Sequence, residues 1–288
     1  MLCGANFPEQ GNNTQTAPPP QCDKEEGVSA GDCSTKIDFD VRTKWPKCLS
    51  VFNNIQNQGQ CGSCWSVSTA SAFGDRYCIE HSKKGGITAN NPSTQFSAFD
   101  LFSCSTNSDG CKGGNPYGAW NFIKSKGVCT GTDYKTKDGC KPYPYASSGS
   151  TPRKQCTSSC TNSQWKIAYS KDKHFATTVK ALQGNSATVQ AIQKEIQTNG
   201  PVVACFMVYK DFMAYKSGKT ANAQKLNGHA VVIMGWGTQT CSGKKIDFWL
   251  IKNSWGTGFG EKGYFKMRRG VNECGIEKGE ISFGMPKI

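Results

Sequence analysis

The sequence lacks long apolar runs, dense basic runs and internal repeats, and each absence excludes a class of protein. None of its 288 residues form the stretch of about 20 apolar residues that a membrane-spanning helix needs, so we expect no membrane partner. The start, Met1-Leu2-Cys3-Gly4, lacks the charged and apolar regions of a signal peptide. The net charge is +13, but lysines and arginines are spread out and form no nucleic-acid-binding module. We therefore expect a solvated basic surface and no nucleic-acid partner.

Cysteine is abundant, in contrast, and histidine is rare. The chain has 16 cysteines and 3 histidines, and the cysteine spacing is too scattered for zinc ribbons. So many cysteines favour an oxidising compartment over a reduced cytosol. We expect disulfide bonds and neither a metal nor an organic cofactor. If one cysteine is a free nucleophile, an odd number remains, so at least one more must be unpaired.

The first 36 residues differ in composition from the rest of the chain. They are rich in Gln, Asn, Thr and Pro, including Ala17-Pro18-Pro19-Pro20, and show no apolar periodicity. They carry more acidic than basic side chains, whereas the remainder is strongly basic. The composition predicts an extended N-terminal segment, 1–36, followed by an ordered domain, 37–288, that begins near Ile37.

Two kinds of periodicity divide the ordered domain. After Ser63, a suitable N-cap, Trp65, Thr69 and Phe73 recur at helical spacing. Residues 103–165 read as disulfide-stapled loops with a short helix near 117–124, and a further helix is expected at 186–198. Glycine-separated β-rich segments follow at 201–209, 229–235, 246–253 and 264–269. This order predicts an α+β protein with a helical lobe (mainly 37–165), an antiparallel β lobe (mainly 166–288) and an active site between them.

Three separate strings supply the groups for thiol catalysis. Cys64 stands at the predicted helix N-terminus, where the helix dipole and a neighbouring imidazolium would stabilise a thiolate. His229 would then protonate the leaving amine, and the Asn253 side chain would fix the ring's tautomer and angle. Gln58 and the backbone N–H of Cys64 can donate to the oxyanion of a tetrahedral intermediate.

Each string has a plainer interpretation when taken alone. Cys61-x-x-Cys64 fits a redox pair or half of a zinc site, although neither a βαβ unit nor a second ligand pair accompanies it. A lone histidine on a strand is by default a core residue, and Asn253-Ser254-Trp255 fits a turn. The presence of all of them in one chain favours the catalytic interpretation.

The strings Cys61-Gly62-Ser63-Cys64-Trp65, Asn227-Gly228-His229-Ala230 and Lys252-Asn253-Ser254-Trp255-Gly256 resemble those of papain-like cysteine proteases. Segments such as 110–114, 139–143 and 274–277 are similar to the cathepsin B branch. The resemblance implies the two-lobed papain-like fold and a peptidase, with Trp255 shielding the His–Asn bond. It implies substrate-binding positions at Gly113, Gly114, Trp65, Gly228, Trp255 and Gly279.

The same resemblance implies part of the disulfide pattern. The pairs carried over by position are Cys48–Cys78, Cys61–Cys111, Cys104–Cys156 and Cys140–Cys160. Cys64 should remain alone, and Cys274 resembles a position left free. It implies no partner for Cys3, Cys22, Cys33, Cys129, Cys205 or Cys241.

Three departures from cathepsin B refine the expectation. The loop between Cys140 and Cys156 is shorter than the occluding loop and contains no histidine, which favours endopeptidase action over dipeptide release. Gly279 stands where cathepsin B has an acidic residue, which favours apolar or aromatic P2 side chains, although a local shift could bring in Glu280. Leu2-Cys3-Gly4 resembles a late propeptide motif, so residues 1–36 are interpreted as the tail of a pro-segment, with an ordinary N-terminal extension as the alternative.

We therefore expect a monomeric thiol endopeptidase acting on proteins and peptides, in a lysosome-like compartment or after secretion, with its own pro-segment as a further partner. The alternative is a catalytically silent, disulfide-rich binding protein on the same fold. A redox protein that uses Cys61 and Cys64 is the third hypothesis.

Overall fold

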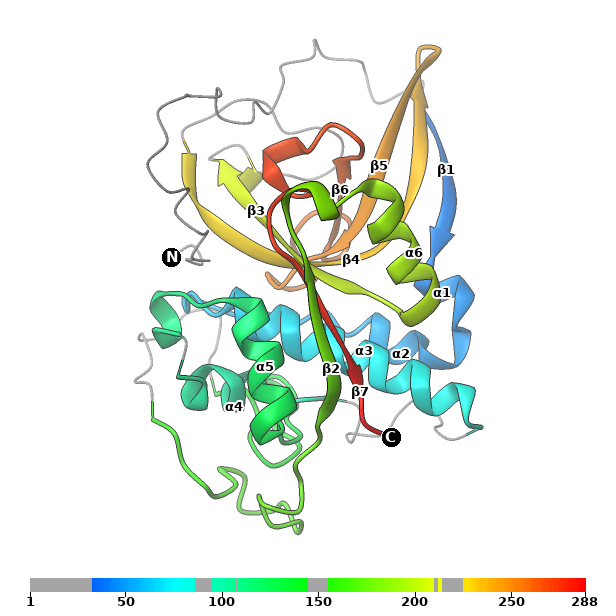
Figure 1. Cartoon of the computed structure of the whole chain (residues 1–288). Coiled ribbons are helices and arrows are strands. Elements are labelled where there is room, and N and C mark those ends of the chain that lie inside the picture. Colours follow the sequence, from blue (N-terminus) through cyan, green and yellow to red (C-terminus); the bar gives the residue numbers. More distant parts are fainter. Residues whose placement is uncertain (1–32, 86–94, 107, 145–154, 210–211, 214–224) are drawn as a thin grey trace.

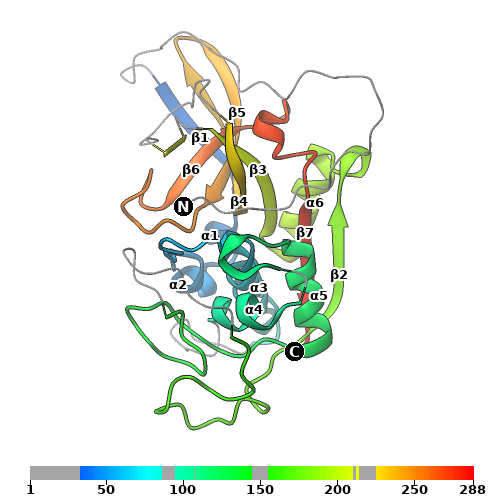
Figure 2. The ribbon, with the colours of Figure 1, turned by 90° about the vertical axis from the view of Figure 1, so that its left-hand side faces the viewer.

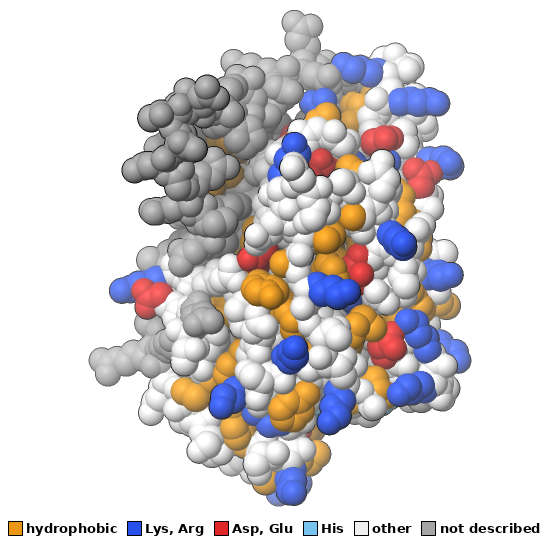
Figure 3. Space-filling view, viewed as in Figure 1, with side chains coloured by type: hydrophobic (Ala, Val, Ile, Leu, Met, Phe, Trp, Pro, Cys, Tyr) orange, Lys and Arg blue, Asp and Glu red, His pale blue; other side chains and the backbone are white. Residues whose placement is uncertain are grey.

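The computed structural model describes residues 33–85, 95–106, 108–144, 155–209, 212–213 and 225–288. Most helices lie below most strands in Figure 1, while α6 (Val189–Asn199) lies beside the sheet and β2 (Ala176–Leu182) and β7 (Ile281–Pro286) run down toward the helices. In the described part of the chain, no helix is long and apolar enough to cross a membrane. Figure 3 shows Lys and Arg side chains scattered over one face, with apolar and uncharged groups between them.

The helical lobe is built around one long, buried helix. Its elements are α1 (Val41–Lys44), η2 (Pro46–Cys48), α2 (Leu49–Phe52), α3 (Cys64–Lys83), α4 (Ala98–Cys104), η4 (Gly110–Lys112) and α5 (Pro116–Lys126). Most of α3 is buried, including Trp65, Phe73 and Ile79. Small residues such as Ala70 and Ala72 let neighbouring elements approach this helix closely. A helix buried on most sides is a rigid support for the residue at its first position.

The β lobe is an antiparallel sheet with an extended central strand. Its strand order is β2 (Ala176–Leu182), β7 (Ile281–Pro286), β3 (Val202–Tyr209), β4 (Lys225–Cys241), β5 (Lys244–Lys252) and β6 (Tyr264–Arg268), while β1 (Cys33–Asp40) also pairs with β4. The remaining elements are η5 (Gly184–Ser186), α6 (Val189–Asn199) and η7 (Glu273–Gly275). The predicted strands at 201–209 and 246–253 match β3 and β5 closely, and β4 is longer than expected.

The first strand begins earlier than Ile37. Cys33 to Asp40 pair with Cys241 to Gly235 of β4, and a disulfide joins Cys33 to Cys241. The two Cα atoms are 4.2 Å apart although 208 residues separate them along the chain. Residues 33–36 therefore belong to the sheet, and Cys33 and Cys241, which had no expected partners, bond to each other.

Two strands and one arginine connect the lobes. Figures 1 and 2 both show β2 and β7 running from the sheet down beside α3 and α5. The fully buried Arg76 of α3 donates to the carbonyl oxygens of Gly200 at 2.9 Å and Pro201 at 2.7 Å, and pairs with Glu195 of α6 at 2.9 Å. Because a buried guanidinium without such partners would be costly, these bonds fix the sheet against α3.

Candidate active site

The first residue of α3 lies against the strand that carries the histidine. Cys64 begins the helix and is fully buried. The backbone N–H of Ala230 in β4 donates to Cys64 Sγ at 3.3 Å. Ala230 directly follows His229, so the sulfur lies against the strand that carries the imidazole, where the two lobes join, although His229 Nδ1 makes no hydrogen bond to it among the described residues. The N–H of Cys64 is at a helix N-terminus, where backbone donors have no partner within the helix.

The histidine and asparagine form a buried pair. His229 Nε2 lies 2.8 Å from Asn253 Oδ1, which also accepts the backbone N–H of Ser254 at 2.8 Å. An amide oxygen can only accept hydrogen bonds. His229 Nε2 must therefore be the donor to Asn253 Oδ1, so Nε2 carries the hydrogen in this tautomer. Among the described residues, Nδ1 of His229 is buried and has no hydrogen-bond partner. The neutral imidazole thus keeps the basic Nδ1 nitrogen for a thiol.

An indole ring covers this pair. The Trp255 ring lies 4.8 Å from the His229 ring, centroid to centroid, and also contacts Phe212 and Phe259. His229 and Asn253 are almost completely buried. A dry surrounding strengthens the His229–Asn253 hydrogen bond, as the shielding role of Trp255 requires.

Burial also shifts the proton affinity of the histidine. It lowers the pKa of His229 from 6.5 to about 4, although the hydrogen bond to Asn253 acts in the opposite direction. This value belongs to a structure in which Cys64 is disulfide-bonded and carries no charge. A thiolate beside Nδ1 would favour the imidazolium and raise the pKa.

The predicted oxyanion donor is held by bonds from both lobes. Gln58 donates through Nε2 to the carbonyl oxygen of Cys61 at 3.0 Å and accepts at Oε1 from the Ser254 hydroxyl at 2.6 Å. The Gln58 N–H donates to the Ser254 carbonyl at 2.9 Å, and an isolated bridge pairs Asn57 with Trp255. The segment after Asn253 and the loop before Cys64 are therefore joined directly. Ser254 fixes both Gln58 and Asn253, a role that the sequence analysis missed.

Cys64 is not a lone thiol in this structure. It is disulfide-bonded, and so is Cys274. The expectation that both would remain unpaired is wrong for this form of the chain, because it was carried over from the resemblance, which assumed a free nucleophile at Cys64 and a free thiol at Cys274. Cys129 and Cys205 are the free cysteines of the described part, and both are buried. A free Cys64 thiolate requires reduction of its disulfide.

The other disulfides match the resemblance. The structure contains Cys48–Cys78, Cys61–Cys111, Cys104–Cys156 and Cys140–Cys160. Because Cys61 is bonded to Cys111, it cannot form a redox pair with Cys64 in this structure, which removes the support for the redox hypothesis.

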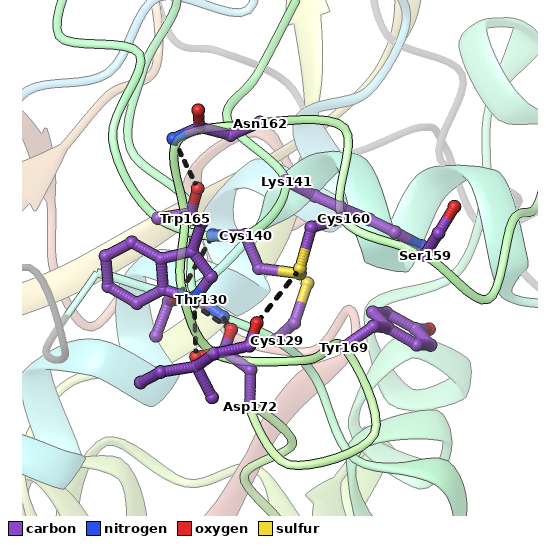
Figure 4. Close-up of a disulfide and its surroundings, with 12 residues drawn as sticks. Cys129, Thr130, Cys140, Lys141, Ser159, Cys160, Asn162, Trp165, Tyr169 and Asp172 are labelled. Carbon is purple, nitrogen blue, oxygen red and sulfur yellow. Dashed lines mark hydrogen bonds between the residues drawn. A yellow bond between two sulfur atoms is a disulfide. The ribbon is translucent and has the colours of Figure 1, made fainter.

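One group of side chains within the described residues has metal-ligand chemistry. The ligand atoms of Cys129, Cys140 and Asp172 lie within 4.8 Å of one another. Figure 4 shows, however, that Cys140 is bonded to Cys160 and that the Asp172 carboxylate already accepts hydrogen bonds from neighbouring residues. Its carboxylate accepts from Thr130 N and Oγ1, both at 2.7 Å, and from Trp165 Nε1 at 3.2 Å. A disulfide sulfur carries no thiolate charge, so this set does not fit a metal and serves to hold loops together.

The residues predicted to bind substrate lie at different depths. Gly113 and Gly114 follow η4, and a Cβ atom at position 114 would overlap the Trp65 ring. Trp65 is fully buried and its Nε1 donates to the Gly110 carbonyl at 3.2 Å. Its ring packs directly against the backbone of Gly114. Gly228 pairs with Met207 in the sheet, next to His229. Glycine at 114 is thus required by packing as well as by backbone access.

Gly279 and Glu280 have different surroundings. Gly279 is partly exposed and its N–H donates to the Gly275 carbonyl at 2.8 Å. Glu280 is buried, with its carboxylate accepting from Asn115 Nδ2 at 2.8 Å and from the Tyr117 N–H at 2.9 Å. Burial raises the pKa of Glu280, although these hydrogen bonds act against the rise. Its charge is directed at the N-terminus of α5.

Comparison with known proteins agrees with this geometry. The family model described as "Papain family cysteine protease" matches residues 36–283. "Cathepsin B-like cysteine proteinase 4" of Caenorhabditis elegans is 42% identical over 267 residues, covering 87% of this chain and 75% of the relative. The "Gut-specific cysteine proteinase" of the same organism is 45% identical over 264 residues, covering 88% and 75%.

Solved structures give the same result. "proCathepsin B S9 from Trypanosoma congolense" has a TM-score of 0.74 and 31% identity, covering 99% of this chain and 86% of that one. A digestive procathepsin L2 from Tenebrio molitor larvae has a TM-score of 0.62 and 26% identity, covering 86% and 67%. The chain belongs to the papain family of cysteine proteases. Within that family it is similar to cathepsin B-like enzymes, which confirms the predicted papain-like α+β fold and a cysteine-type peptide hydrolase.

Proposed function

We propose that this chain is an endopeptidase in which Cys64, once reduced, attacks the peptide carbonyl. His229 Nδ1 takes the thiol proton and later gives it to the leaving amine, while Asn253 holds the ring through Nε2. The second Nε2 hydrogen of Gln58 and the N–H of Cys64 stabilise the oxyanion. The observation that carries the proposal is the buried His229–Asn253 bond of 2.8 Å beside the Cys64 sulfur.

The silent binding protein is the weaker alternative. A protein that only binds peptides has no need for an oriented imidazole next to a sulfur. Nor does it need the Ser254 hydroxyl to fix Gln58 at 2.6 Å. Burying these polar groups costs free energy. A catalytic role explains why the chain keeps them buried and oriented, whereas a binding role does not.

The proposal for the pro-segment and for the compartment of the enzyme is based on the sequence. The expected pro-segment, 1–36, is shortened in this proposal to residues 1–32, which lie outside the described residues, because residues 33–36 belong to β1 and pair with β4. The many disulfides fit an oxidising, lysosome-like or extracellular compartment. The enzyme would act as a monomer on protein and peptide substrates.

Endopeptidase action is proposed from the short loop after Cys140. Residues 145–154 of that loop lie outside the described residues, so endopeptidase action is inferred from the amino-acid sequence of the loop. No histidine stands between Cys140 and Cys156 to bind a substrate's C-terminal carboxylate. Internal cleavage of a protein substrate should therefore exceed release of C-terminal dipeptides.

We further propose a preference for apolar or aromatic side chains at P2. Gly279 offers no charge to a P2 arginine, and the Glu280 carboxylate is bound by Asn115 and Tyr117 at 2.8 and 2.9 Å. Breaking those bonds to reach a substrate would leave two partly buried donors without their acceptor. The P2 pocket is therefore neutral in its resting arrangement.

Peptide substrates that differ only at P2 test this preference. We expect kcat/KM for P2 Phe to exceed that for P2 Arg by about tenfold or more, a difference within the reach of one pocket contact. The matched variant Gly279→Glu places a carboxylate at this position and should raise the relative rate for Arg. Wild-type enzyme that prefers P2 Arg over Phe and Leu would contradict the neutral pocket.

A further inference from the structure

The two donors of the oxyanion site are linked by a tyrosine hydroxyl that the mechanism has not used. Tyr143 Oη donates to the Gln58 carbonyl oxygen at 2.9 Å and lies 2.7 Å from Ser63 Oγ. A phenol has one hydrogen, which is committed to Gln58, so the Ser63 hydroxyl must donate to Tyr143. All three residues are buried, at most 3% exposed. The hydroxyl therefore bridges the Gln58 residue and the residue before Cys64.

The use of Ser63 supports this assignment. Ser63 is the N-cap residue of α3, yet its side chain makes no capping hydrogen bond. Serine at this position commonly caps a helix through its own oxygen. Here its hydroxyl turns to Tyr143, so the start of α3 is tied to the Gln58 loop.

A short ladder of hydrogen bonds fixes Tyr143 itself. The Tyr143 N–H donates to the Thr132 carbonyl at 2.8 Å, and the Lys141 N–H donates to the Thr130 carbonyl at 3.0 Å. Thr130 is held by Asp172, and the Cys140–Cys160 disulfide closes the same unit (Figure 4). Lys141 Nζ pairs with Asp100 of α4 at 2.8 Å, with both side chains almost fully buried. The position of the hydroxyl is therefore set by a rigid, cross-linked scaffold.

We propose that Tyr143 is a positioning residue for the oxyanion site, because it fixes the spacing between Gln58 and the Cys64 N–H. Oxyanion donors act only when they point to where negative charge develops in the transition state. A loosened Gln58 would bind substrate almost as before but would stabilise the intermediate less well. Loss of the hydroxyl should therefore lower kcat and leave KM nearly unchanged. This inference rests on the proposed peptidase function.

The test is Tyr143→Phe, assayed with a peptide amide substrate after mild reduction. We expect kcat to fall about tenfold, as for loss of one buried hydrogen bond, with KM within about twofold of wild type. Alkylation of Cys64 by iodoacetamide forms no oxyanion, so its rate should not change. In a Gln58→Ala background, Tyr143→Phe should have an effect of less than about threefold, because the side-chain oxyanion donor that Tyr143 positions through the Gln58 backbone is already missing.

Tyr264→Phe is the matched control. Tyr264 is also buried, and its hydroxyl donates to a backbone oxygen, that of Phe52, at 3.0 Å. It makes no contact with Gln58 or Ser63 in the described hydrogen bonds, so Tyr264→Phe should keep the wild-type kcat. A general loss of packing would instead affect both variants and the alkylation rate.

The possible results distinguish failure of the Tyr143 positioning role from failure of the proposed peptidase function. Wild-type kcat in Tyr143→Phe would overturn the positioning role and leave the peptidase function intact. An equal loss in the wild-type and Gln58→Ala backgrounds, or a parallel fall in alkylation, would also overturn it. A reduced wild-type chain without peptidase activity would overturn the proposed function, and this inference with it.

Discussion

At the scale of single residues, the site depends on hydrogen bonds that give each polar atom one orientation. Asn253 Oδ1 accepts from His229 and Ser254, and Gln58 is held through its backbone and its side chain. None of these groups can rotate without leaving a buried donor or acceptor unpaired. The orientation is therefore fixed before substrate arrives, which is the condition for electrostatic catalysis.

The lowered pKa of His229 predicts a pH dependence of stability. Its folded pKa of about 4 lies below the ordinary 6.5, so the unfolded chain binds the proton first as pH falls. The histidine is neutral in both states above about pH 6.5 and contributes nothing there. Between pH 6.5 and 4 its contribution becomes increasingly unfavourable, by about 3 kcal/mol in total.

Urea unfolding of the disulfide-bonded form measures this effect. The free energy of unfolding of wild type relative to His229→Gln should decrease by about 3 kcal/mol from pH 6.5 to pH 4. After reduction of Cys64 the decrease should be smaller, because a thiolate stabilises the imidazolium. A relative stability that stays flat across this range would contradict the burial argument.

Sequence alone reached some of these residues and not others. Cys64, His229, Asn253 and Gln58 stand in strings whose residue types carry chemistry, so they could be named in advance. Ser254 and Tyr143 act through hydroxyls, and Tyr143 lies 85 residues from Gln58 in the sequence. A tyrosine in a cysteine-rich loop has no local pattern that reveals such a long-range contact.

At the scale of elements, α3 and β5 are joined by a buried ion pair next to the site. Lys252 Nζ lies 2.8 Å from Asp75 Oδ2, and both side chains are at most 2% exposed. Lys252 ends β5 and precedes Asn253, while Asp75 lies on the helix that begins with Cys64. Burial raises the pKa of Asp75, and the charge of Lys252 opposes that rise. The pair thus holds the strand that ends at Asn253 against α3.

Breaking this pair should destabilise the fold strongly. Lys252→Met leaves Asp75 as a buried charge without its partner, so we expect a loss of about 3–5 kcal/mol in unfolding free energy. Adding Asp75→Leu should recover much of that loss. The control is Lys83→Ala at the exposed Lys83–Glu80 pair, where side chains are 42% and 20% exposed and the change should be below about 1 kcal/mol. Equal losses in the two single variants would contradict the special role of the buried pair.

The elements that sequence analysis missed share a physical cause. Strand β1 exposes most of its side chains and β2 buries only one, so both lack the regular apolar alternation that marks a half-buried strand. β7 contains glycine and proline, which weaken a strand signal. Their pairing is set by distant parts of the chain, as the register of Cys33 with Cys241 shows. By contrast, α3 and β3 carry strong local patterns and were predicted.

At the scale of the whole molecule, the two lobes divide the proposed catalytic groups between them. The helical lobe holds Cys64 and Gln58, and the β lobe holds His229 in β4 and Asn253 directly after β5. Pairing of residues 56–58 with 254–256 joins the two sets directly. The proposed active site therefore depends on the docking of the two lobes, and its Cys64 is disulfide-bonded in this structure.

In our proposal, the chain is a thiol peptidase and Cys64 is the nucleophile of this assembled site. The most direct measurement is active-site titration with an epoxide-type thiol-protease inhibitor, before and after mild reduction, with the labelled peptide identified by mass spectrometry. We expect little labelling before reduction, and afterwards labelling of Cys64 in proportion to the peptidase activity that appears. Peptidase activity that survives full labelling of Cys64, or no labelling of Cys64 after reduction, would contradict it.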